Sequence, residues 1–383
     1  MKREVLLPTY FEKFSCVGAA CEDTCCAGWK VQVDKKSFQK YRKVTSGSIA
    51  NDLRMNITRE RTDPSDNNYA KIKMDEDMNC AFLNEDKLCN IYIELGESYL
   101  CNTCTFYPRQ MTEVENRVEK DLSVSCPEAA RLILLNPEGI DFIFHEEQFD
   151  KKMPFTHVTV PNHFWDIRMF AIQILQSHYA PIESRLLVLG MFMEKMQATP
   201  QIEWAQKLPV YINEYEGILY RSEQLNLHTN LPSNLEMVNM TYILVQFQKD
   251  YELYNPRFGE CITELKEGLQ LLGDDTLQLS VALYNKYEQE YYKPFFEKNS
   301  HILENYLVNY LFKNTLPQNP SRFAKEYAQV LMCFLFLKAT LIGMAGYHQT
   351  LSEEMVIKLI QSFTKTLENN AVFRDFMNKV LGD

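Results

Sequence analysis

Several common classes of protein are excluded by what the 383-residue sequence lacks. No apolar run reaches the roughly 20 residues that a membrane-spanning helix needs. The most apolar segment, Val330 to Ala345, is interrupted by Lys338, so we expect a buried core helix there and no membrane insertion. No basic patch offsets the net charge of −11, which argues against nucleic-acid binding.

We also expect no signal peptide at the beginning of the sequence. Lys2 and Arg3 supply basic charge, but the apolar run that follows ends at Pro8, far too early for a signal peptide. Without export, we expect the chain in the reducing cytoplasm. Clustered cysteines in that compartment are more typical of metal ligands or redox groups than of structural disulfides.

Cysteine is scarce over the last two thirds of the chain, which holds only Cys261 and Cys333, and abundant before it. Thiolates gathered together need a cation or a disulfide to neutralise them. The predicted metal ligands are the nine cysteines of the first 126 residues: Cys16, Cys21, Cys25, Cys26, Cys80, Cys89, Cys101, Cys104 and Cys126. This pattern favours metal binding over a set of buried thiols.

The expected ligand set is all sulfur, because no histidine occurs before His145. Four thiolates suit structural zinc, and they equally suit an iron–sulfur cluster, so spacing alone does not choose between the two. Nine thiolates suffice for two four-cysteine sites with one left over. The adjacent Cys25 and Cys26 cannot both reach one metal comfortably, which suggests that they serve different metals or that one binds none.

The composition changes near residue 140. Before it, period-two alternation predicts short strands over 29–34 and 69–74 and a hairpin of 109–114 with 117–123, turning at Glu115 and Asn116. After it, helical periodicity predicts seven or eight helices. We therefore expect an α+β, predominantly helical protein. Its two domains are a cysteine-rich metal-binding domain, 1–140, and an all-α domain, 141–383.

Helix ends are indicated at three places. Pro127 suits the first position of a helix capped by Cys126, whose pKa the helix dipole would lower. Asn319 and Pro320 form a similar cap and start. Thr350 and Glu353 match the spacing of a capping box.

At this point the sequence resembles a known family, the flagellin lysine N-methylases. The resemblance lies in Cys16-x4-Cys21-x3-Cys25-Cys26-Ala27-Gly28-Trp29, Cys80-Ala81-Phe82-Leu83, Leu88-Cys89-Asn90-Ile91, Thr103-Cys104-Thr105-Phe106-Tyr107-Pro108-Arg109 and Ser125-Cys126-Pro127-Glu128-Ala129-Ala130-Arg131. The cysteines alone indicate a broader group of bacterial proteins presumed to chelate zinc or iron. A second block, His301 to Asn314 followed by Pro317, resembles the C-terminal region of the methylases and narrows the match.

The resemblance implies transfer of a methyl group from S-adenosylmethionine to the ε-amine of flagellin lysines. It also implies an iron–sulfur cluster on the cysteines, with zinc as the alternative. Two signatures of methyl-donor chemistry are absent: no G-x-G-x-x-G occurs, and Gly28 stands where a C-x3-C-x2-C run beginning at Cys21 needs cysteine. The runner-up interpretation is therefore a non-catalytic metal-binding scaffold, and a third is another cluster-dependent modifying enzyme.

Three residues are candidates for binding the methyl donor. Arg109 could grip its carboxylate, or could equally brace the metal domain. Tyr306 and Tyr310 lie on one helical face and could contact an adenine ring or a methylated ammonium, although core packing is the commoner reason for such a pair. The sequence assigns no catalytic residue.

Overall fold

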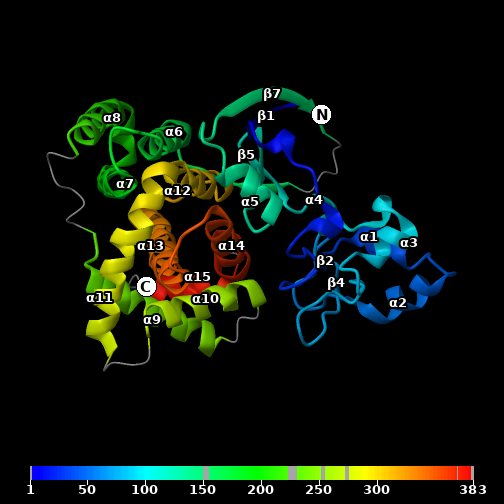
Figure 1. The fold of residues 1–383 in the computed structure, drawn as a ribbon. Coiled ribbons are helices and arrows are strands. Elements are labelled where there is room, and N and C mark those ends of the chain that lie inside the picture. Colours follow the sequence, from blue (N-terminus) through cyan, green and yellow to red (C-terminus); the bar gives the residue numbers. More distant parts are fainter. Residues whose placement is uncertain are drawn as a thin grey trace.

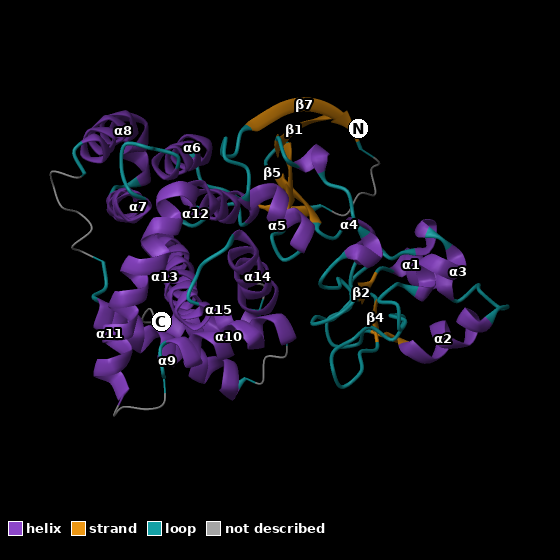
Figure 2. Ribbon diagram, viewed as in Figure 1, coloured by secondary structure: helices purple, strands orange, loops and turns teal. Residues whose placement is uncertain are grey.

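The computed structural model describes residues 2–149, 155–222, 231–251, 255–271, 276–368 and 370–380. An N-terminal mixed α/β region with two sheets is followed by an all-helical region (Figures 1 and 2). This order of strands first and helices afterwards confirms the expected fold class at that level.

The larger sheet has five strands in the order β7-β1-β6-β5-β8. Its strands are β1 (Lys2–Pro8), β5 (Arg109–Val114), β6 (Arg117–Leu122), β7 (Phe142–Gln148) and β8 (Thr156–Val158). Strands β5 and β6 form the expected hairpin around Glu115 and Asn116. Strand β1 runs parallel to β6 and antiparallel to β7. Because β7 and β8 follow residue 140, the sheet takes residues from both sides of the expected domain boundary.

We call residues 15–107, between β1 and β5, the cysteine unit. It contains a small sheet in the order β2-β4-β3 and four short helices. Its elements are β2 (Gln32–Val33), α1 (Lys35–Tyr41), α2 (Ser48–Asn56), β3 (Ile57–Arg59), β4 (Ala70–Ile72), α3 (Asn90–Leu95) and α4 (Asn102–Phe106). Strands β2 and β4 lie within the two predicted runs. Val33, Ile72 and Phe82 belong to a core of its own, so the unit packs around its own apolar residues.

Helix α5 (Pro127–Leu134) begins at Pro127 with Cys126 as its N-cap, as expected. The helical region that follows holds ten α-helices within the described residues, more than the seven or eight expected. They are α6 (Phe164–Leu175), α7 (Ile182–Ala198), α8 (Trp204–Tyr220), α9 (Asn234–Asp250), α10 (Pro256–Gly268), α11 (Leu277–Tyr287), α12 (Lys293–Lys313), α13 (Phe323–His348), α14 (Glu353–Phe363) and α15 (Ala371–Val380).

The two expected caps near the C-terminal helices had different outcomes. Asn319 accepts a hydrogen bond from the Ser321 amide and Pro320 begins a short 3-10 helix, which confirms that cap. The capping box at Thr350 was wrong. Helix α14 is capped by Ser352, whose side chain accepts from the Met355 amide, because the chain is extended at Ser352 and turns helical directly after it.

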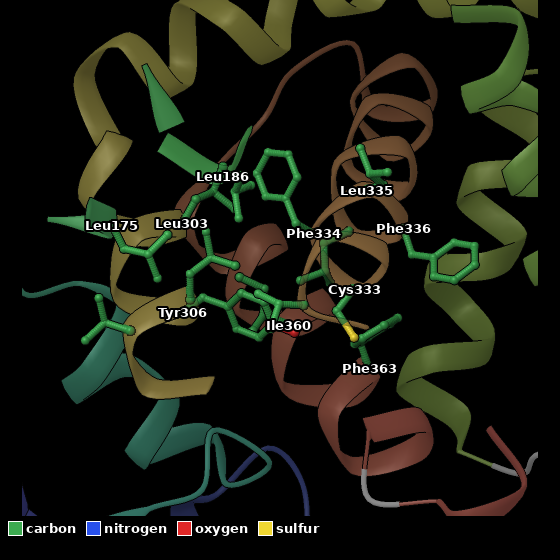
Figure 3. Packing of buried hydrophobic residues seen from close by; sticks show 14 of the residues in the cluster. Leu175, Leu186, Leu303, Tyr306, Cys333, Phe334, Leu335, Phe336, Ile360 and Phe363 are labelled. Atoms are coloured by element: carbon green, nitrogen blue, oxygen red, sulfur yellow. The ribbon is translucent and has the colours of Figure 1, made fainter. Parts of the chain in front are cut away.

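The central helix α13 is buried, as its apolar sequence predicts. The stretch Pro320–His348 is long and apolar enough to cross a membrane, but 72% of its most apolar window is buried inside the protein. Figure 3 shows Cys333, Phe334 and Phe336 from this helix packed among apolar side chains of its neighbours. The core helix predicted over 330–345 is thus confirmed.

Helices α10 and α13 cross at glycine. A Cβ added to Gly268 would lie 1.9 Å from the carbonyl oxygen of Gly343. The two backbones can approach this closely only because Gly268 and Gly343 have a hydrogen atom as their side chain.

Candidate functional site

Six cysteines of the cysteine unit form one group. The thiol of Cys26 hydrogen-bonds to those of Cys25 and Cys89, and its carbonyl oxygen accepts from the Cys80 amide at 2.7 Å. The sulfurs of Cys101 and Cys104 are 3.6 Å apart in a second pair. Electrostatic interactions connect Cys80 and Cys104 with Cys25, Cys89 and Cys101. We call these residues the six-thiol group: Cys25, Cys26, Cys80, Cys89, Cys101 and Cys104.

The other three predicted ligands, Cys16, Cys21 and Cys126, form a separate group, which we call the three-thiol group. Each interacts electrostatically with the other two. Cys126 joins them from the start of α5, outside the cysteine unit. The segment from Cys21 to Cys26 therefore connects the two groups. Cys261 and Cys333 are buried in the helical region and belong to neither.

Burial and thiol–thiol hydrogen bonds set the acidity of these cysteines. A hydrogen bond from the Cys26 thiol lowers the pKa of Cys25 to about 7 and that of Cys89 to about 6. Burial raises the pKa of Cys80 to about 11. It also raises the pKa of Cys126 to about 11, because desolvation outweighs the amides at the start of α5. The expected lowering at Cys126 was therefore wrong.

The donor chemistry of the two groups fits a thiophilic metal. Every candidate ligand is sulfur, and soft thiolates select zinc or iron–sulfur clusters. In the part of the chain that the structure describes, no three cysteine, histidine or carboxylate side chains are already arranged around a common point for a metal ion. The ligand role of the nine cysteines therefore stays a prediction.

A cleft lies where the cysteine unit, the five-stranded sheet and the helical region meet. It consists of two adjoining cavities of about 480 and 630 Å³. Both are lined by Gln32, Thr103, Phe106, Arg109 and Gln110. We call it the junction cleft. The first cavity also reaches Trp29, Tyr107, Ser125 and Lys365, and the second reaches Thr112, Thr156, Lys313 and Gln318.

Arg109 is the cation of the junction cleft that lacks a carboxylate partner among the described residues. Its guanidinium lies 4.8 Å from the centre of the Phe14 ring and donates to the Phe14 carbonyl at 3.5 Å. The rings of Trp29 and Tyr107 are 5.6 Å apart, and the Trp29 indole donates to the Cys25 carbonyl at 2.8 Å. A guanidinium can pair with a carboxylate, and neighbouring aromatic rings can pack against a flat ring. The cleft can therefore bind a ligand that has both groups.

The two candidate tyrosines lie elsewhere. The hydroxyl of Tyr306 donates to the buried Glu368, and Figure 3 shows its ring in the helical core. Tyr310 packs against the same core beside Lys313 and Cys333. Neither residue lines the junction cleft. The structure thus brings Arg109 to the cleft and places Tyr306 and Tyr310 in the packing between helices.

Sequence reasoning missed a set of polar contacts behind the cleft. Asp23, in the segment between the two thiol groups, is bound by Lys365 and Gln361 from the helical region. A carboxylate placed among thiolates needs a nearby cation, so the position of Asp23 between Cys21 and Cys25 could have predicted a cationic partner for it. No comparable signal existed for Lys365, which lies 342 residues away in the π-helical turn η9 (Thr364–Glu368).

Comparison with known proteins gives three relatives and one family. The FliB lysine N-methylase C-terminal domain matches residues 168–383. The flagellar biosynthetic protein FliU of Salmonella muenchen is 35% identical over 134 residues, which cover 35% of this chain and 78% of FliU.

Two proteins named lysine-N-methylase are also similar. The protein from Salmonella typhimurium is 34% identical over 137 residues, 35% of this chain and 33% of that protein. The protein from Salmonella choleraesuis is 34% identical over 134 residues, which again cover 35% of this chain and 33% of that protein. The matched part thus spans a third of the length of each. No solved structure matches the chain.

Proposed function

The chain belongs to the family of the FliB lysine N-methylase C-terminal domain, and from this premise we propose that it transfers a methyl group from S-adenosylmethionine to lysine ε-amines of flagellin in the cytoplasm. The single observation that carries the proposal is this family match over residues 168–383. The junction cleft supports it, because it offers the groups that the methyl donor requires.

We place the methyl donor in the junction cleft. Arg109 would hold the donor carboxylate, and the packed rings of Trp29 and Tyr107 would offer an aromatic surface to the adenine ring. Direct transfer requires a neutral lysine amine held in line with the methyl group, away from water. The described lining contains Arg109, Lys313 and Lys365 but no carboxylate. With no carboxylate in this lining to stabilise an ammonium ion, removal of the substrate lysine from water favours its neutral, nucleophilic amine.

We further propose that the cysteines hold an iron–sulfur cluster, with zinc as the alternative. The six-thiol group has enough sulfur for a four-cysteine site, and the three-thiol group would supply three of the ligands of a second site. An iron–sulfur cluster supplies electron transfer, and zinc in an all-cysteine site supplies folding energy. The methyl transfer described above needs neither, so the residues of the cleft are assigned their roles independently of the metal.

The proposal is tested by producing the protein together with flagellin and measuring the mass of flagellin peptides. We expect methyl groups added to lysine, and none when the protein is omitted. A flagellin of unchanged mass beside protein that has its metal would reject the enzyme and favour the non-catalytic metal-binding scaffold.

Replacing Arg109 by methionine is expected to weaken the binding of S-adenosylhomocysteine by about tenfold or more, since a charge-assisted hydrogen bond to a carboxylate contributes roughly 1.5–3 kcal/mol. Isothermal titration calorimetry measures this change. Arg54→Met, at an exposed position on α2, is the matched control and should bind like the wild type. Equal affinities for the two variants would remove Arg109 from the donor site.

A further inference from the structure

Side chains of the helical region bind the segment that connects the two thiol groups. The ammonium group of Lys365 lies 2.9 and 2.8 Å from the two carboxylate oxygens of Asp23 and donates to the Thr24 carbonyl at 2.8 Å. The side-chain amide of Gln361 donates to Asp23 at 2.8 Å and to the Ser125 carbonyl at 2.8 Å. Asp23 is thus held by two residues of the α14–η9 segment.

These contacts are shielded from water. The side chain of Lys365 is 6% exposed and that of Asp23 is 14% exposed. Gln361 is fully buried, and its amide oxygen accepts from Arg257 at 3.0 Å. A buried ion pair is weak evidence for stability but is costly to break, because removing one partner strands the other charge. The ion pair between Lys365 and Asp23 therefore fixes the position of Asp23 more than it stabilises the folded protein.

The neighbouring Glu22 is held in the same way. It forms ion pairs with Arg131 of α5 and with Arg257 of α10, the second at 3.9 Å. The two acidic residues are flanked by Cys21 of the three-thiol group and Cys25 of the six-thiol group. The contacts that hold Glu22 and Asp23 therefore fix the distance between the three-thiol group and the six-thiol group.

We propose that Lys365, supported by Gln361, is a positioning residue for the cysteines: it holds Asp23 so that Cys21, Cys25 and Cys26 are presented to metal. The helical region would then raise metal affinity without contributing a ligand. Residues that orient metal ligands from outside typically change affinity by about 10- to 100-fold when mutated. This inference rests on the metal-binding part of the proposed function.

The test is an anaerobic titration of the full chain with Co²⁺, followed by the thiolate-to-cobalt charge-transfer absorption. Lys365→Met should weaken Co²⁺ binding by about tenfold or more. Lys365→Arg, which keeps the charge, should restore affinity to within a few-fold of the wild type. Lys358→Met is the matched control, because Lys358 forms ion pairs with Glu260 and Glu264 inside the helical region alone. It should bind Co²⁺ normally.

A double variant separates positioning from a general loss of structure. The double variant Asp23→Asn with Lys365→Met should bind Co²⁺ no more weakly than the weaker-binding single variant. The reason is that each substitution removes the same contact, the ion pair between Asp23 and Lys365. Independent, additive losses would overturn the positioning role. So would equal affinities for Lys365→Met and Lys358→Met. A wild-type protein that gives no charge-transfer band would instead reject the proposed metal binding itself.

Discussion

Replacing Cys104 or Cys126 by serine is expected to abolish metal binding and flagellin methylation together, because the cysteine unit that lines the junction cleft would lose the metal that holds its fold. Cys104 is paired with Cys101 inside the six-thiol group, and Cys126 belongs to a group with no spare sulfur. A serine hydroxyl stays protonated near neutral pH and is a hard donor, so it does not replace a thiolate on zinc or iron. The measurements are iron, sulfide and zinc contents after anaerobic purification and the mass of co-produced flagellin.

The controls are Cys261→Ala and Cys333→Ala. Both cysteines are buried in the helical core, apart from the two thiol groups, so these variants should keep metal and activity. About four irons per site in the wild type would favour the iron–sulfur cluster over zinc. Full metal content in the Cys104 and Cys126 variants would contradict their assignment as ligands.

Replacing Gly268 by alanine is expected to cost about 3 kcal/mol of folding free energy, at the upper end of overpacking penalties. The added methyl group would lie 1.9 Å from the Gly343 carbonyl oxygen, and a backbone atom cannot move aside as a flexible side chain can. Helices α10 and α13 would have to separate. Denaturation by urea, followed by circular dichroism, measures the loss.

Gly259→Ala is the matched control on the same helix. A Cβ at Gly259 would meet no atom within 4 Å. Alanine there should stabilise the protein by about 0.5–1 kcal/mol, because it favours the helix and restricts the unfolded chain. If both substitutions had the same effect, the close crossing of α10 and α13 would not be what constrains Gly268.

The features that the sequence predicted well are those determined by nearby residues. The hairpin of β5 and β6 follows from alternation on either side of a two-residue turn, and the start of α5 follows from Pro127. The cap of α14 failed for the same local reason, since Ser352 competes with Thr350 and stands next to the helix.

The arrangement of the site could not be read in this way. The division of the cysteines into groups of six and three depends on long-range contacts, such as Cys126 joining Cys16 and Cys21. The helical spacing of Tyr306 and Tyr310 is commoner in a core but does not exclude a ligand site, and only their packing in the helical core decides between the two. Lys365 reaches Asp23 across 342 residues, a contact without a local pattern.

The interior position of β1, between β7 and β6, constrains the order in which the chain can fold during synthesis. Glu4 of β1 and its partner Arg117 of β6 are 113 residues apart. At roughly 5–20 residues per second, β1 waits several seconds or longer for its neighbours to be translated. All eight cysteines of the cysteine unit are made in that interval. The unit is therefore complete before the sheet closes, so the metal proposed above would be able to enter it on the ribosome, and the helices made last dock onto a segment that has already formed.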